Sequence, residues 1–235
     1  NNNRFFENAA EGVNMLNGFV KISADGTVEL VQHRADLRQR FCIQYSYKPK
    51  LTAAHSGLLD TLFTGCFGTD SEEYGSLILQ IYGTSICGVG TRLKEPKACI
   101  LYGQSAANGK STIQEVLRRI LPHDVICSIS PGDMDREQYL AKLIGASANL
   151  TDELSTAAAI SSDKFKAVIT GDPVTAKIIY KEPVEFKPRA MHILSTNELP
   201  SFKGGIDAGI ERRLLVIPFN LTIPVGERIS DFETK

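Results

Sequence analysis

Short apolar runs alternate with amphipathic stretches through the second part of the chain. The apolar runs have the length and composition of buried strands, and they cover residues 98–102, 125–128, 148–150, 191–195 and 214–219. Helical spacing of apolar residues predicts helices between them, over residues 111–121, 136–144 and about 160–170. Residues 174–186 favour a β-hairpin. This alternation predicts an α/β fold, with a parallel sheet covered by helices.

The first part of the chain has a different pattern. Two β-type runs flank the turn dipeptide Asp25-Gly26 and predict a hairpin over residues 18–31. Apolar residues then recur at helical spacing from His55 to Ile86, and the polar stretch Thr91–Pro96 is typical of a linker. We therefore expect an α-rich subdomain with a hairpin over residues 1–92 and a strand-and-helix domain over 93–235.

Composition narrows the classes of protein that fit. With 235 residues, 43% of them hydrophobic, the chain can bury a sizeable core. Its 26 basic and 27 acidic residues nearly cancel, so a polyanion must be met by a local patch rather than by the whole surface. No apolar run approaches the length of a membrane helix and no signal peptide is evident, so we expect no membrane partner.

Cysteine and histidine usage gives no sign of a metal or disulfide framework. The five cysteines are scattered without CxxC spacing, which indicates small buried hydrophobes in a reducing compartment. The four histidines are dispersed, and His192 lies in an apolar strand where a core position is expected. The asparagine-rich start and the polar end indicate a piece of a longer polypeptide.

The stretch Gly103–Thr112 carries the clearest chemistry. It reads Gly-Gln-Ser-Ala-Ala-Asn-Gly-Lys-Ser-Thr and departs from the usual P-loop by one residue, because five residues rather than four separate its glycines. The glycines would let backbone N–H groups at a helix N-terminus face phosphates, while Lys110 would reach the β- and γ-phosphates and Ser111 would ligate Mg²⁺. The expected nucleotide-binding residues are Gly103, Ala107, Asn108, Gly109, Lys110, Ser111 and Thr112. The alternative is a glycine-rich turn with a surface lysine.

A P-loop requires an acid at the end of a neighbouring strand. Asp152 and Glu153 follow the strand predicted at residues 148–150. Asp152 could hold Mg²⁺ through water, and Glu153 could polarise the attacking water as general base. An isolated Asp-Glu pair is usually solvated surface, but its place behind a P-loop favours the catalytic interpretation.

Two further stretches fit the same chemistry. The strand over 191–195 leads to Asn197, whose amide could orient the attacking water or merely cap a turn. Arg212 and Arg213 precede the last strand; they are either surface charge or, in a ring ATPase, groups that reach a neighbouring subunit's nucleotide.

Between the acids and Asn197, the span 163–189 holds six basic and four acidic residues, a net charge of +2. A basic hairpin there could follow a single strand through phosphate contacts.

In this order, the stretches resemble the superfamily 3 helicases, and more closely the phage and plasmid primase-helicases related to the poxvirus primase-helicase. The most specific parts of the resemblance are residues 107–112, 165–172, 193–200 and 212–219. The first 90 residues or so resemble the helical collar before the motor of such proteins, through Asn17-Gly18 and Leu79–Gly83.

The resemblance implies an AAA+ core, a hexameric ring and ATP-dependent 3′-to-5′ unwinding of DNA in the replication of a mobile element or virus. By the family's roles, Lys110 and Ser111 serve motif A, Asp152 and Glu153 serve motif B, and Asn197 is sensor 1. The implied cofactors are ATP and Mg²⁺.

The resemblance also implies partners. Lys177 and Lys181 lie on the DNA-contacting hairpin, and Arg213 is the arginine finger, with Arg212 as the close alternative. The partners are single-stranded DNA, identical subunits in a ring and a primase domain upstream on the same polypeptide. The implied location is the cytoplasm of a bacterial host or of a virus-infected cell.

Other classes of protein share part of this pattern. A different AAA+ ATPase, such as a packaging motor or replication-initiator loader, fits the P-loop, although the basic hairpin and the late arginine pair argue against it. A small-molecule kinase fits less well, because nothing resembles a lid or acceptor pocket. A nucleotide-free binding module would not need the P-loop, the acid pair and Asn197 together.

Overall fold

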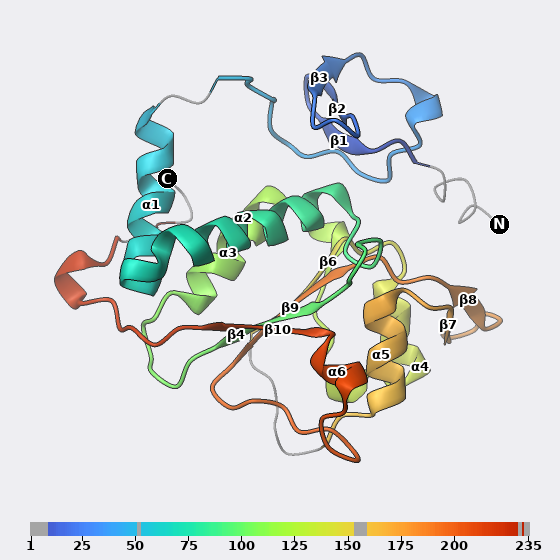
Figure 1. The fold of residues 1–235 in the computed structure, drawn as a ribbon. Helices are drawn as coiled ribbons and strands as arrows, with labels where there is room; N and C mark the ends of the chain where they lie inside the picture. Colours follow the sequence, from blue (N-terminus) through green and yellow to red (C-terminus); the bar gives the residue numbers. More distant parts are fainter. Residues whose placement is uncertain (1–8, 51–52, 153–158, 230–231, 233–235) are drawn as a thin grey trace.

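The core of the molecule is a sheet of five parallel strands (Figure 1). The computed structural model describes residues 9–50, 53–152, 159–229 and 232. The sheet is ordered β10-β4-β9-β6-β5, and its strands are β4 (Ala98–Tyr102), β5 (Ile126–Cys127), β6 (Ala148–Thr151), β9 (Met191–Thr196) and β10 (Leu214–Pro218). Neighbouring strands run parallel throughout. The predicted α/β fold with a parallel sheet is confirmed.

Helices cover both faces of this sheet (Figure 1). One face carries α1 (Ala53–Phe67), α2 (Ser71–Cys87) and α3 (Lys110–Ile120); the other carries α4 (Glu137–Leu140), α5 (Ser162–Thr170) and α6 (Ala208–Glu211). Side chains alternate along a strand, so Cys99 and Leu101 are buried with the first set of helices and Ala98 with the second. Burial on both faces explains why the strands are almost continuously apolar.

A small antiparallel sheet forms the N-terminal part of the chain. Its strands are β1 (Gly12–Met15), β2 (Gly18–Ile22) and β3 (Val28–Val31). The predicted hairpin is confirmed as β2 and β3: Gly26 has a φ of +83°, and the Asp25 carboxylate accepts the Thr27 N–H at 2.9 Å. Strand β1 was not predicted, because Gly-Val-Asn-Met carries only two apolar side chains.

The helices α1 and α2 share one hydrophobic core with the parallel sheet. Phe63 and Ile78 belong to the same buried cluster as Cys99, and the ring centroids of Phe67 and Phe219 lie 4.8 Å apart. Packing therefore groups both helices with the sheet and leaves β1–β3 at the periphery. The functional division at residue 92 stays a prediction.

The shorter elements complete the fold. The predicted hairpin over 174–186 is β7 (Val174–Ala176) paired antiparallel with β8 (Val184–Phe186). The helix predicted over 136–144 is wrong in its second half: α4 ends at Leu140, η6 (Ala141–Leu143) is a 3-10 turn, and Gly145, at a φ of +83°, turns the chain into β6. The other 3-10 turns are η2 (Ala35–Leu37), η3 (Gly68–Asp70), η4 (His123–Val125), η5 (Pro131–Asp133) and η7 (Val225–Glu227).

The cysteines follow the prediction in part: all five are free thiols, Cys66 and Cys99 are buried, and Cys42, Cys87 and Cys127 are half-buried. His192 is a core residue, and burial lowers its pKa to about 4. Among the described helices, none combines the length and the apolar character that a membrane crossing requires.

Candidate functional site

The predicted site residues after β4, β6 and β9 meet at the carboxyl edge of the sheet. The loop 103–109 follows β4, Asp152 follows β6 and Asn197 follows β9. Parallel strands end at the same edge, and ligands in open α/β sheets bind there. Glu153 lies outside the described residues.

Both glycines of the P-loop are required by their surroundings. A Cβ on Gly103 would lie 2.5 Å from the Phe219 carbonyl oxygen, so a side chain there would push the loop away from the segment after β10. Gly109 has a φ of +92°, and its Cβ would lie 2.2 Å from the Cys66 sulfur on α1. Both ends of the loop therefore pack so closely on neighbouring segments that only glycine fits at these two positions.

Lys110 is held at the centre of the site. Its Nζ donates to the Gly103 carbonyl at 2.6 Å and to Asn197 Oδ1 at 3.3 Å, and the residue is 8% exposed. Burial lowers the pKa of the Lys110 ammonium, and a negative charge beside it would stabilise the charged form. A phosphate group would supply that charge.

The remaining P-loop residues fall into two groups. Asn108 is buried and ties the loop together, because its amide donates to the Ser105 carbonyl at 2.7 Å. Ala107 has a φ of +54° and is exposed, as is Ser111 at the start of α3. Thr112 is half-buried and faces a cavity beside the loop.

This cavity measures about 720 Å³ and lies between α1 and the segment after β10. Thr61 and Gly65 of α1 line one wall, and Ile223 and Arg228 line another. The Ile223 N–H donates to the Ala107 carbonyl at 2.9 Å, which fixes the C-terminal segment against the P-loop. The cavity falls in the size range of small-molecule sites and adjoins the loop that fits phosphates.

Asp152 is engaged by an arginine of α3. Arg118 Nη2 donates to Asp152 Oδ1 at 2.7 Å, and the Asp152 side chain is 65% exposed. Among the described residues, no three His, Cys, Asp or Glu side chains gather as a metal cluster. Because Arg118 already pairs with Asp152, a Mg²⁺ ion held by the predicted ligands Ser111 and Asp152 would compete with Arg118 for the carboxylate.

Gln114 and Arg118 are site residues that the sequence analysis missed. Gln114 is fully buried, and its amide donates to the Thr151 carbonyl at 3.1 Å and to Ser195 Oγ at 2.9 Å. Arg118 Nη2 lies 3.3 Å from Gln114 Oε1. Lys110, Gln114 and Arg118 are spaced by four, which puts them on one face of α3. This spacing was the signal in the sequence from which Gln114 and Arg118 could have been predicted as site residues.

Arg212 and Arg213 lie at the opposite, amino edge of the sheet. They precede Leu214, which pairs with Ala98 at the start of β4, so five strand residues, roughly 16 Å, separate them from the P-loop. Arg213 is half-buried and donates to the Gly209 carbonyl at 2.6 Å; burial, then the neighbouring Arg212, lowers the pKa of its guanidinium. The Arg212 side chain is exposed.

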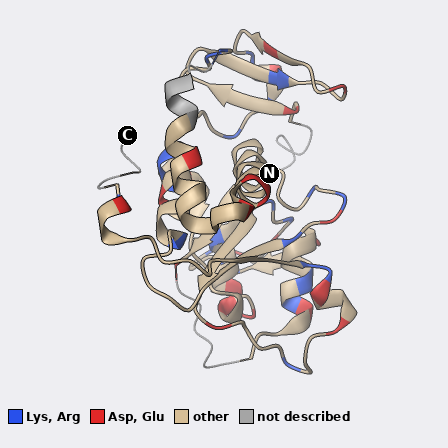
Figure 2. Cartoon of the chain, turned by 60° about the vertical axis from the view of Figure 1, so that its left-hand side comes forward, with Lys and Arg blue, Asp and Glu red and all other residues tan. Residues whose placement is uncertain are grey.

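The hairpin β7–β8 carries Lys177 and Lys181 on its exposed loop. Between them, Ile179 is 72% exposed and Tyr180 is fully exposed at a φ of +60°. These two residues were also missed, although apolar residues between lysines were visible in the sequence. Figure 2 shows acidic and basic residues interspersed along the described chain, so local groups such as this one must provide any selectivity for a polyanion.

A comparison with protein families matches the stretch that holds the P-loop, Asp152, the hairpin and the arginine pair. The model of a family of unknown function, DUF5906, matches residues 101–213, a little under half of the chain. This span starts directly before the P-loop and ends at Arg213. A protein of Acanthamoeba polyphaga mimivirus named "Putative helicase L207/L206" is 35% identical over 149 residues, which are 60% of this chain and 15% of that protein.

Comparison with solved structures bears on the fold. The C-terminal region of NrS-1 superposes with a TM-score of 0.56 at 19% identity, over 76% of this chain and 41% of that one. JCV helicase, with a bound acetamide compound, has a TM-score of 0.46 at 13% identity, over 72% of this chain and 46% of that one. The chain thus spans less than half of each of these proteins, and the likeness to NrS-1 supports the α/β architecture alone.

Proposed function

We propose that this chain is the ATP-hydrolysing motor of a DNA helicase. The observation that carries the proposal is the position of Lys110, buried between the Gly103 carbonyl and the Asn197 amide at the carboxyl edge of a parallel sheet. A lysine after a glycine-rich loop at a helix N-terminus is suited to the phosphates of a nucleoside triphosphate. The mimivirus relative named as a helicase supports the same class of activity.

The residues at the site fit ATP and Mg²⁺. The phosphates would contact the loop 103–109 and Lys110, and the adenosine would enter the cavity between α1 and Ile223. Ser111 and Asp152 would hold Mg²⁺, which supplies neutralisation of the phosphate charge. Asn197 would orient the attacking water, and Glu153 is proposed as the general base.

Hydrolysis is proposed to occur between subunits of a ring of six. The 16 Å or so between the arginine pair and the P-loop prevents Arg212 or Arg213 from reaching the nucleotide of its own subunit. In the proposed ring, the head-to-tail contact between copies would bring the amino edge of one sheet to the carboxyl edge of the next. Arg213, or Arg212 as the alternative, would then stabilise transition-state charge in the neighbour.

Single-stranded DNA is the proposed track, with the hairpin as the part that contacts it. Lys177 and Lys181 offer charge to phosphates and Tyr180 offers a face for base stacking. Replication of a phage, plasmid or viral element, a primase domain on the same polypeptide and a location in the cytoplasm of the infected or host cell belong to this proposal.

A strand-displacement assay tests the proposal. Lys110→Ala, made in a longer polypeptide that contains this chain, removes the main phosphate contact and is expected to lower ATP hydrolysis and unwinding at least a hundredfold. Lys94→Ala is the matched control, because Lys94 is exposed in the polar linker. The control is expected to keep full activity.

The outcomes separate the candidate functions. Equal unwinding by the Lys110 variant and the unaltered protein would contradict the proposal. ATP hydrolysis stimulated by single-stranded DNA without strand displacement would instead favour a packaging motor or loader.

A further inference from the structure

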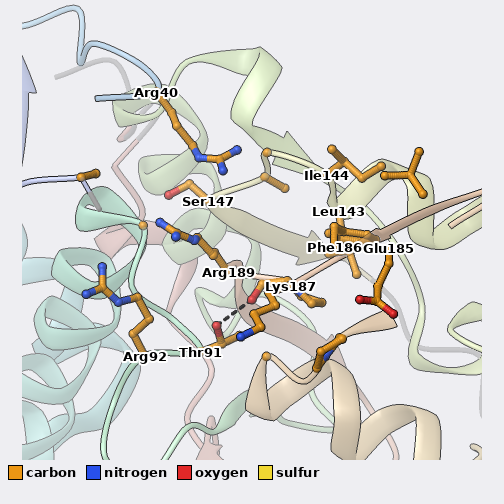
Figure 3. A pocket seen from close by; sticks show the side chains of 18 of the residues that line it. Arg40, Thr91, Arg92, Leu143, Ile144, Ser147, Glu185, Phe186, Lys187 and Arg189 are labelled. Carbon is orange, nitrogen blue, oxygen red and sulfur yellow. Dashed lines mark hydrogen bonds between the residues drawn. The ribbon is translucent and has the colours of Figure 1, made fainter. Parts of the chain in front are cut away.

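A second cavity, of about 780 Å³, lies at the amino edge of the sheet (Figure 3). Its walls come from the end of α2, the segment before β6, the segment after η2 and the base of the hairpin β7–β8. It is therefore at the opposite edge from the P-loop. None of the functional assignments made above uses it.

Basic side chains gather at one end of this cavity. Arg40, Arg92, Lys187 and Arg189 line it, against two acids, Glu182 and Glu185. Figure 3 shows the guanidinium groups of Arg40 and Arg189 on either side of Ser147, with Glu185 at the far end. The excess of two positive charges is local, because the chain as a whole has a net charge of −1. An anionic ligand is the natural complement of this end.

The walls of the cavity are tied to one another. The Thr91 hydroxyl donates to the Pro188 carbonyl at 2.7 Å, and the Ser147 hydroxyl donates to the Ser85 carbonyl. A Cβ on Gly90 would lie 2.5 Å from the Met191 backbone nitrogen, so the chain after α2 packs tightly on the start of β9. These contacts pre-form the space, which reduces the ordering cost of binding.

We infer that this cavity binds the sugar-phosphate backbone of a single-stranded nucleic acid. The inference rests on the proposed function, because it extends the track of the strand from the hairpin loop to the hairpin base. Val184, Glu185 and Phe186 of β8 line the cavity together with Lys187, so a strand that runs from Lys181 and Tyr180 toward the base of the hairpin would reach it next. Arginine forks match phosphate geometry, and the P-loop already provides a separate site for a free nucleotide.

Charge reversal on exposed residues tests the site in the 235-residue chain. The double variant Arg92→Glu/Lys187→Glu is expected to raise the dissociation constant of a labelled oligothymidylate about tenfold or more, measured by fluorescence anisotropy. The slope of log affinity against log salt concentration is expected to fall by about one for each lost phosphate contact. Binding of a fluorescent ATP analogue should stay unchanged. Lys48→Glu/Lys94→Glu is the control, because both lysines are exposed outside the cavity.

Acetylation of the unaltered protein provides a second measurement that does not depend on a variant. Bound oligothymidylate should protect Lys187 from an acetylating reagent, read by mass spectrometry, and leave Lys48 and Lys94 reactive. Oligothymidylate affinity equal to that of the control, or an unprotected Lys187, would overturn the inference. Loss of the ATP analogue alone would identify a free nucleotide as the occupant and would overturn it as well.

Failure of this site differs from failure of the proposed function. If Lys177→Ala/Lys181→Ala weakens oligothymidylate binding and the cavity variant does not, only the cavity assignment fails. If the unaltered chain binds no oligothymidylate in the presence of the ATP analogue, both fail.

Discussion

At the scale of single residues, the candidate site is organised along one face of α3. Lys110 faces the P-loop, Gln114 bridges β6 and β9, and Arg118 holds Asp152. A partly exposed ion pair such as Arg118–Asp152 contributes little to stability, typically below 1 kcal/mol. Its consequence is chemical, because it occupies the carboxylate that is proposed to hold Mg²⁺.

Arg118→Gln is expected to lower the Mg²⁺ concentration that half-saturates ATP hydrolysis. The substitution removes the cation that competes for the Asp152 carboxylate and leaves a shorter, uncharged polar side chain in its place. Titrating Mg²⁺ at saturating ATP measures the effect, and Arg119→Gln is the control, since Arg119 pairs with Glu115 instead. A higher Mg²⁺ requirement in Arg118→Gln would show that the arginine positions the carboxylate rather than competing for it.

His192 should make the stability of the fold depend on pH. It is buried in β9 beside Asn149, its Nε2 has no hydrogen-bond partner among the described residues, and burial lowers its pKa to about 4, from 6.5. Between these values the unfolded chain binds the proton and the folded chain does not. Acidification through this window therefore favours unfolding, by up to about 3 kcal/mol.

His192→Gln is expected to remove much of this pH dependence. Urea unfolding at several pH values between 4 and 7 measures it, with His123→Gln as the control because His123 is exposed. The same slope of unfolding free energy against pH in the His192 variant and in the unaltered chain would be incompatible with this explanation.

At the scale of elements, the features that could be predicted are those that depend on the local pattern of apolar and polar residues. Strand β4 and helix α3 begin and end within a residue of their predicted bounds, because apolar runs and helical spacing are local signals. The pairing of Arg118 with Asp152 spans 34 residues and depends on how α3 lies against the sheet. Likewise, exposure of Tyr180 depends on the register Val174↔Phe186, which leaves residues 177–183 as the loop.

The hairpin β7–β8 offers a prediction of its own. Tyr180→Ala is expected to weaken single-stranded DNA binding by about 1–3 kcal/mol, because an exposed ring at the loop can stack on a base. Tyr180→Phe keeps the ring and is expected to retain most of the affinity. Anisotropy titrations of both variants measure the difference, and equal loss in both would point to the hydroxyl rather than to stacking.

At the scale of the whole molecule, the two edges of the sheet carry different parts of the chemistry. The P-loop, Asp152 and Asn197 lie at the carboxyl edge. The arginine pair, the hairpin and the second cavity lie at the amino edge. Under the proposed function, a single copy would bind nucleotide but would lack the arginine that the transition state is proposed to need. Activity should depend on contacts between copies.

Mixing two inactive variants tests this dependence. Lys110→Ala removes the lysine of one edge, and Arg212→Ala/Arg213→Ala removes the arginines of the other. If each active site combines both edges, a random mixture restores the full pair at about a quarter of the contacts between copies. ATP hydrolysis should then recover to roughly that fraction of the unaltered rate, and Lys110→Ala mixed with itself should recover nothing. An inactive mixture of variants that still assemble would contradict a shared site. Full activity of the arginine variant alone would show that neither arginine takes part. If the mixture does recover, single substitutions at Arg212 and Arg213 would identify which of the two acts.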